Sequence, residues 1–236
     1  DNLGRITKIK GPKDPDYTLR FDYRPEVRLD QGGGIEYPAY AVTRHYDPQH
    51  PGNPIETVTF ADGFGKIIQV KKDAFIDGQE RMIVSGRVKY DPFGRVAESF
   101  YPQVGARNYD LFNYAGSEDS HKTLTEYDVL DRVTKVTLPD GTITETAYSI
   151  DGGLLKTLVT DALGKKQASY TDGSGMTVRT EQYPDENEVI ATHFEFDGIN
   201  RLTAVTDAMG MQTLSEYDMA DRRTKVTHPA SGTTEY

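Results

Sequence analysis

Aspartates recur along this chain at positions that could bind a metal ion or hold a backbone turn. Asp91, Asp128, Asp197 and Asp218 each follow an aromatic residue. Calcium sites gather several oxygen ligands in one short loop, with aspartates at alternate positions before a glycine. These aspartates are single and far apart, and an aspartate that opens a turn can accept hydrogen bonds from backbone N–H groups two residues later. The spacing favours turn capping over calcium binding, and we expect no metal and no cofactor.

Groups suited to catalysis are scattered rather than clustered. The histidines show no H-E-x-x-H or H-x-x-E-H spacing; they are His45, His50, His121, His193 and His228. His45 and His50 flank a short segment that a metal could approach, but we interpret them as a loop pair. Ser174 lies in a glycine-rich turn without the spacing of a nucleophile elbow, and Gly32-Gly33-Gly34 lacks the lysine and hydroxyl of a phosphate loop. We therefore expect no enzymatic activity.

An internal repeat organises the chain. Residues 127–139 return as residues 217–229, with nine of the thirteen positions identical. Weaker copies lie between them, so that the positions opening each copy, 127, 148, 170, 196 and 217, are 21, 22, 26 and 21 residues apart. The residues predicted to form the structural repeat motif are Tyr90, Asp91, Gly94, Arg95, Tyr127, Asp128, Arg132, Phe196, Asp197, Arg201, Tyr217, Asp218 and Arg222.

Each copy is typical of a β-hairpin. An extended run ends on an aromatic, a turn opens with Asp and closes with Gly, Asn or Asp, and a second extended run follows Arg or Lys. A lone hairpin is only marginally stable, so neighbouring repeats are expected to pair into one extended antiparallel sheet. Val133 and Val136 break the strand period of two, which indicates a bulge or a late strand start. We predict an all-β fold of tandem hairpins.

Composition agrees with this fold and excludes several partners. The chain has 15 Tyr, 9 Phe, 22 Gly and 12 Pro in 236 residues, with a mean hydropathy of -0.63, which suits strands, turns and thin aromatic packing. The net charge of -10 has no basic block, so we expect no nucleic-acid partner. No apolar run is long enough for a membrane span, and cysteine is absent, which excludes disulfides.

The phrase Tyr90-Asp91-Pro92-Phe93-Gly94-Arg95-Val96, echoed at about twenty-one residues, resembles the YD repeat. This repeat occurs in bacterial Rhs proteins, in the B and C components of insecticidal toxin complexes and in teneurins. The resemblance implies a curved antiparallel sheet, here residues 61–236, after an irregular strand-rich segment at 1–60. It also implies part of the wall of a β-cage around a C-terminal toxin or other cargo.

The partners implied by this resemblance are the other repeats of one large polypeptide and the enclosed cargo. The self-cleaving core that ends the cage in the family is not visible in this sequence, so we expect a fragment of a larger secreted or cell-surface protein whose targeting signal lies elsewhere. Glycans or another toxin-complex subunit are further candidate partners. The alternative function is an adhesion module that recognises a glycan or a partner cell, in which exposed tyrosines bind glycans instead of filling the core.

Overall fold

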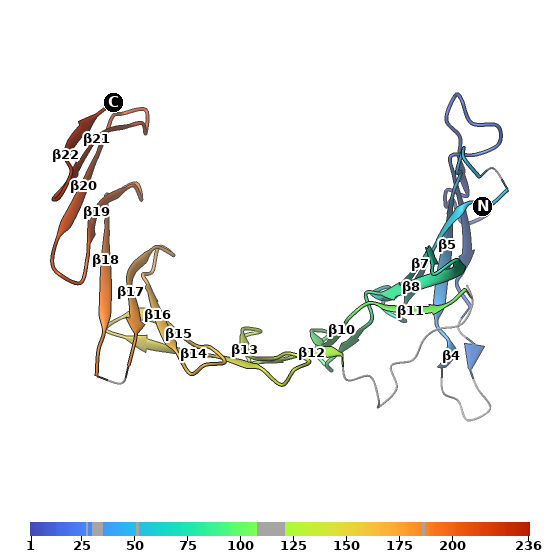
Figure 1. Ribbon diagram of the computed structural model, residues 1–236, viewed down its shortest axis with the longest axis horizontal. Coiled ribbons are helices and arrows are strands. Elements are labelled where there is room, and N and C mark those ends of the chain that lie inside the picture. Colours follow the sequence, from blue (N-terminus) through green and yellow to red (C-terminus); the bar gives the residue numbers. More distant parts are fainter. Residues whose placement is uncertain (27, 30–34, 51, 108–120, 186) are drawn as a thin grey trace. The chain divides into compact units, whose positions relative to one another are not determined.

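The chain is all β over the part that the computed structural model describes, residues 1–26, 28–29, 35–50, 52–107, 121–185 and 187–236. Figure 1 draws every described element as an arrow, and paired strands run antiparallel. The predicted all-β class and antiparallel pairing are therefore confirmed. The glycine run at 32–34 lies outside the described residues. The chain divides into two compact units, Asp1–Thr125 and Glu126–Tyr236.

Unit 1 (Asp1–Thr125) contains a seven-stranded sheet in the order β1-β2-β5-β6-β7-β8-β11. Its strands are β1 Lys8–Ile9, β2 Leu19–Arg24, β5 Ala39–His45, β6 Ile55–Ala61, β7 Ile67–Ile76, β8 Gln79–Ser85 and β11 Gln103–Ala106. The unit also holds the pair β3 Arg28–Leu29 and β4 Ile35–Tyr37, and the hairpin of β9 Val88–Tyr90 and β10 Val96–Phe100. Strand β12 Lys122–Tyr127, whose first residues pair with β10, contains the boundary between the units.

The domain boundary that the sequence suggested at residue 60 falls within β6. Residues on both sides of it pair with β5 and β7, for example Tyr40 with Phe60 and Ala61 with Ile67. In the structure, the strands before and after residue 60 therefore belong to one sheet.

Alternating burial along β6 places the hydrophobic core of unit 1 on one face of this sheet. Glu56, Val58 and Phe60 are buried, while the residues between them are partly exposed. Val58 and Phe60 cluster with Val42 of β5 and Met82 of β8 because cross-strand register puts these side chains on the same face.

Unit 2 (Glu126–Tyr236) is a meander in which each strand from β13 onward pairs with the next. The strands are β13 Val133–Thr137, β14 Ile143–Asp151, β15 Leu154–Thr160, β16 Lys166–Thr171, β17 Thr177–Tyr183, β18 Ile190–Phe196, β19 Leu202–Thr206, β20 Gln212–Tyr217, β21 Arg223–His228 and β22 Gly232–Glu235. Successive turns therefore lie at opposite ends of the strands.

Little apolar surface is buried in unit 2. Among its described residues, the buried hydrophobic side chains are Ala168, Tyr170 and Ala204. Tyr170 is covered by polar side chains: the guanidinium of Arg179 lies 3.7 Å from its ring centroid, and Lys156 Nζ lies 5.1 Å away. Long polar side chains thus do the covering that a second layer of secondary structure does in most sheets.

A one-residue irregularity follows many of the turns. Among the described strand pairs, the register shifts beside the turns that follow β6, β9, β16, β18 and β20, so that one residue is unpaired in each; these residues are Ile68, Ala97, Val178, Thr203 and Thr224. Thr203 and Thr224 donate their hydroxyls to the carbonyls of Glu195 and Glu216. In the copy of the repeat that starts at Tyr127, the position equivalent to Thr203 is Thr134. Thr134 lies between Val133 and Val136, where the sequence indicated a bulge or a late strand start.

The core of unit 1 makes a direct prediction about stability. Phe60 is fully buried, whereas Phe75 is 74% exposed. Phe60→Ala should lower the free energy of unfolding by about 3–5 kcal/mol, because it removes buried contacts and leaves a cavity. Phe75→Ala, the matched control, should change it by less than about 0.5 kcal/mol. Denaturant melts of both variants would measure this, and equal losses would show that the core lies elsewhere.

Candidate functional site: aspartate turns and tyrosine clamps

One turn geometry recurs through the chain, and Asp91 shows it fully. Asp91 Oδ1 accepts hydrogen bonds from the backbone N–H groups of Phe93 and Arg95, both at 2.9 Å. The Gly94 N–H donates to the Asp91 carbonyl at 2.9 Å, and the Asp91 N–H donates to the Arg95 carbonyl at 2.8 Å. This is a type I turn followed by a left-handed residue, a common way to close a hairpin. We call this five-residue unit an aspartate turn.

Among the described residues, nine aspartates accept the same pair of backbone hydrogen bonds. They are Asp1, Asp62, Asp91, Asp128, Asp161, Asp172, Asp197, Asp207 and Asp218. Sequence reasoning missed Asp161 and Asp207, which lie at the opposite strand ends and follow Thr instead of an aromatic. Their signal is a Gly three residues after the Asp, in Asp-Ala-Leu-Gly and Asp-Ala-Met-Gly.

The residue that closes each turn has a positive φ. Gly94 has a φ of 79°, and the non-glycine residues in this position, Asp131, Asn200 and Asp221, have φ values of 61°, 66° and 61°. Glycine adopts this conformation without strain, while Asn and Asp tolerate it better than other side chains. This tolerance explains why the repeat closes on these three residue types.

Arginine completes four of the predicted motifs. Its Nε donates to the second carboxylate oxygen of the turn aspartate at 2.7 to 2.8 Å; the pairs are Arg95 with Asp91, Arg132 with Asp128, Arg201 with Asp197, and Arg222 with Asp218. Each carboxylate thus binds two backbone N–H groups and one guanidinium. Its oxygens already have these donors, so the geometry gives the aspartates a structural role.

These contacts lower the pKa of each motif aspartate. For Asp197 and Asp218, the backbone N–H and then the guanidinium of the paired arginine hold the carboxyl pKa below its ordinary value. For Asp91 and Asp128, partial desolvation acts in the opposite direction, but the hydrogen bonds from Arg95 and Arg132 outweigh it and the pKa is again lowered. The turns therefore favour the ionised aspartate.

The cation of one turn also holds the tyrosine of another strand. Arg132 lies 4.1 Å from the ring centroid of Tyr148, whose hydroxyl donates to the Val133 carbonyl at 3.1 Å. We call this arrangement, a cation over a tyrosine ring and the hydroxyl on the next carbonyl, a tyrosine clamp. The same clamp joins Arg5 with Tyr23 and Ile6, Lys66 with Tyr90 and Ile67, and Arg201 with Tyr217 and Leu202.

The remaining motif residues occupy the same strand ends. Tyr127 and Phe196 end β12 and β18 and are partly buried. Phe196 has no hydroxyl to donate, and the preceding aspartate turn, at Asp172, carries Met176 where clamp-forming turns carry a cation. Arg201 extends the contact to the next turn as well, with Nη1 at 2.9 Å from the Asp218 carbonyl.

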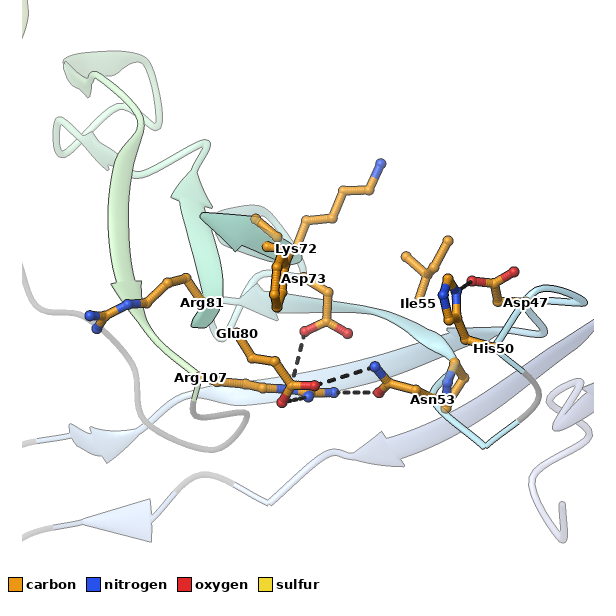
Figure 2. A pocket seen from close by; sticks show the side chains of 12 residues that line it. Asp47, His50, Asn53, Ile55, Lys72, Asp73, Glu80, Arg81 and Arg107 are labelled. Atoms are coloured by element: carbon orange, nitrogen blue, oxygen red, sulfur yellow. Dashed lines mark hydrogen bonds and ion pairs between the residues drawn. The ribbon is translucent and has the colours of Figure 1, made fainter. Parts of the chain in front are cut away.

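A separate polar pocket of about 290 Å³ lies in unit 1 (Figure 2). Arg107 reaches into it and pairs with Glu80, with Asn53 Oδ1 at 3.1 Å and with Asp73 Oδ1 at 3.5 Å. Burial raises the pKa of Asp73, while the Glu56 N–H and Arg107 act in the opposite direction. His50 Nδ1 lies 2.8 Å from Asp47 Oδ2, a contact within one loop.

The charges of this pocket pair mainly with one another, which is a structural arrangement. Over the described part of the chain, no group of three or more His, Asp or Glu side chains is placed to hold a metal ion. The same residues include no helix with the length and hydropathy needed to cross a bilayer.

Comparison with protein families places an RHS repeat at the C-terminal end of the chain. Residues 196–234 match the family model described as RHS Repeat. This segment holds the aspartate turns at Asp197, Asp207 and Asp218 and the clamp between Arg201 and Tyr217. The resemblance of the sequence to YD-repeat proteins is thereby confirmed. A search of curated proteins found no significant match.

Solved structures of toxin complexes share the fold. The crystal structure of TcdB2-TccC3 aligns with a TM-score of 0.73 and 16% identity over 99% of this chain and 14% of that chain. The Photorhabdus luminescens Tc holotoxin pore aligns with a TM-score of 0.69 and 14% identity, over 99% of this chain and 15% of that chain. TcdB2-TccC3 without its hypervariable C-terminal region aligns with a TM-score of 0.63 and 15% identity, over 95% of this chain and 16% of that chain. The chain thus spans about one-seventh of the length of these structures, and the likeness is one of fold.

The positive φ of Gly94 can be tested against a glycine in another turn position. Gly94→Val should lower the free energy of unfolding by about 1–3 kcal/mol, because a β-branched residue is strained at this φ. Gly63 lies in the Asp62 turn without a positive φ, and its Cβ would meet open space. Gly63→Val should therefore cost clearly less in the same denaturant melts. An equal cost would show that the left-handed position is not what selects glycine.

The hydroxyl of the tyrosine clamp can be removed without removing the ring. Tyr148→Phe should lower the free energy of unfolding by about 0.5–1.5 kcal/mol, the usual net value of one hydrogen bond. Tyr236 is 73% exposed, and Tyr236→Phe is the matched control, expected to be neutral. Thermal and denaturant unfolding of both variants would measure these changes in the free energy of unfolding. A neutral Tyr148→Phe would mean that the ring and cation alone form the clamp.

The turn carboxylates should make the stability of the folded chain depend on pH in the acidic range. Because the pKa values of Asp91, Asp128, Asp197 and Asp218 are lowered in the folded chain, their contribution is complete above the unfolded-state pKa of about 3.9. It is lost as pH falls through the lower folded-state pKa. The melting temperature should therefore drop below about pH 4.

The control for this pH dependence is a variant with Asp197→Asn and Asp218→Asn. Asparagine keeps the Oδ1 acceptor but cannot titrate, so the variant should melt lower near neutral pH and lose less on acidification. An acid-induced drop as large as that of the unsubstituted chain would assign the pH dependence to other carboxyl groups.

Proposed function

We propose that this segment is a non-catalytic part of the wall of a YD-repeat shell, which encloses a C-terminal toxin or other cargo. The support from comparison is the RHS repeat at residues 196–234 and the shared fold with TcdB2-TccC3. One matched structure is described as lacking a hypervariable C-terminal region, and another contains Cdc42 beside TcdB2-TccC3. Those descriptions concern the matched proteins, and they motivate the cargo in the proposal.

The observation that carries the proposal is the repetition of the aspartate turn and the tyrosine clamp. Among the residues that the structure describes, there are four tyrosine clamps, two in each unit, and aspartate turns close many of the hairpins. When such contacts join each repeat to a nearby one, a sheet can add further repeats without a large hydrophobic core. Unit 2 has this character, since it buries few apolar side chains. A single layer of sheet held in this way suits a wall with solvent on both sides.

The proposal also implies partners and a location. The wall would pair with further repeats of the same polypeptide, and its inner side would face the cargo. A protein of this kind would be secreted or displayed at the cell surface. No catalytic role is assigned to the aspartates, because the turn backbone and the arginines already bind their oxygens.

A second function, glycan binding on a cell-surface module, is favoured by one surface feature. Phe64 and Phe93, at the tips of neighbouring aspartate turns, are 92% and 81% exposed. They flank a pocket of about 340 Å³ that Tyr90 and Lys66 also line. Exposed aromatic faces can stack on sugar rings, and an exposed patch of this kind often marks a binding surface.

The test of the wall function uses the full-length protein that contains this segment. Electron microscopy should show a closed hollow particle, and limited proteolysis should leave a C-terminal segment uncut until the particle is denatured. An open particle whose C-terminal segment is cleaved at once would overturn the proposal. A glycan array with the full-length protein and with a variant carrying Phe64→Ala and Phe93→Ala tests the second function. Binding lost in the variant would favour the adhesion module.

A further inference from the structure

Three lysines converge on one pocket in unit 2. Lys156 of β15, Lys165 of the Asp161 turn and Lys166 of β16 line a pocket of about 530 Å³ together with Tyr183 of β17. The whole chain has a net charge of -10, so a pocket lined by three lysines is a positively charged region of an acidic chain. One acidic residue, Asp185, also lines the pocket.

Sheet register places these residues on one face of the sheet. Lys166 pairs with Tyr183 across β16 and β17, and Lys156 pairs with Tyr170 across β15 and β16. Because side chains alternate along a strand, Lys156, Lys166 and Tyr183 project from the same face. Leu158 lies on that face too and forms an apolar part of the lining.

The edge of the pocket is held in place by a hydrogen bond between two loops. Lys165 Nζ donates to the Pro184 carbonyl at 2.7 Å, which joins the turn before β16 to the segment after β17. Lys165 stands at the turn position where the clamps have Arg or Lys over a tyrosine. Here it braces a loop beside the pocket instead.

The tyrosine side of the pocket is also fixed. Tyr183 and Tyr170 both donate their hydroxyls to Glu181 Oε2, at 2.5 Å and 2.7 Å. The carboxylate of Glu181 is bound by these phenols and by Arg179 Nε at 3.2 Å. Glu181 therefore has its own partners, and it is not among the residues that line the pocket.

Lys156 favours its charged form, and the side chain of Lys166 is available for a ligand. Hydrogen bonding to Tyr170 raises the pKa of Lys156, with partial desolvation acting against it. The side chain of Lys166 has no hydrogen-bond or ion-pair partner among the described residues. An ammonium group without a partner beside two others favours a compact anion.

We propose that this pocket binds a small ligand that carries a phosphate, sulfate or carboxylate group, with the anion between Lys156, Lys165 and Lys166. The volume lies in the range of small-molecule sites. Leu158 and Pro184 offer apolar contact to the rest of the ligand, such as a sugar ring. A long polyanion does not fit this site, because the net charge of the chain repels it.

Calorimetric titration of the 236-residue chain at low ionic strength tests the site, with inorganic phosphate, sulfate and glucose 6-phosphate as probes and glucose as the neutral control. Saturable binding of one equivalent that weakens with added salt is expected for the anions, and no heat for glucose. Tighter binding of glucose 6-phosphate than of phosphate would assign the site to a phosphosugar, and equal binding to the free anion. Heat that never saturates with any anion would overturn the proposal.

Two double variants locate the binding. Lys165→Gln with Lys166→Gln should weaken binding at least about tenfold, because two of the three charges are lost. Lys135→Gln with Lys225→Gln removes the same charge elsewhere in unit 2, where those lysines pair with Glu126 and Glu216. This control should change the dissociation constant by less than about twofold. Equal weakening by both would show that only net charge matters and would overturn the site.

Chemical-shift mapping on the unsubstituted chain gives an answer that does not depend on how the variants fold. The backbone amides of Leu158, Lys166 and Tyr183 should shift most on addition of phosphate. Shifts spread evenly over lysines in both units would overturn the proposal.

Discussion

Two hydrogen bonds from the backbone to one aspartate carboxylate hold each aspartate turn closed, and many hairpins of this chain are built on these turns. A hairpin turn leaves backbone N–H groups outside the strand ladder, and unpaired backbone groups are costly wherever water is excluded. In the Asp128 turn, one oxygen accepts two of these groups, and the other oxygen binds Arg132 Nε at 2.7 Å. The turn therefore carries its own acceptor and does not rely on a second layer of structure.

The same carboxylate positions the group that holds another strand. Arg132 is aligned by Asp128 and lies over Tyr148, and Arg201 is aligned by Asp197 and lies over Tyr217. A cation over an exposed aromatic ring contributes about 0.5–1 kcal/mol, and a net hydrogen bond about 1 kcal/mol. Each clamp is thus modest. Many such contacts between nearby repeats can still stabilise a sheet whose unit 2 buries few apolar side chains, as in other repeat proteins.

The turn leaves its two central positions free to vary. The side chains there make none of the contacts that define the turn, and they project into solvent, as at Phe93, Leu163 and Met219, which are 81%, 86% and 106% exposed. The position after the left-handed residue is also reused, since Lys165 braces the lysine pocket where Arg132 forms a clamp. One backbone design can therefore present different surface chemistry from repeat to repeat, which suits a wall with local binding sites.

Local residue spacing predicts the turns, whereas the strands that those turns connect and hold follow from the pairing of the sheet. The hydrogen bonds of Asp91 reach two and four residues along the chain, so residue types at fixed spacing are enough to predict them and the left-handed Gly94. In the clamps, the tyrosine hydroxyl donates to a carbonyl 15 to 23 positions away in the sequence, and the lysine pocket combines three strands. Those partners depend on strand register, which sets which side chains share a face, and register follows from the pairing of the whole sheet rather than from any one repeat.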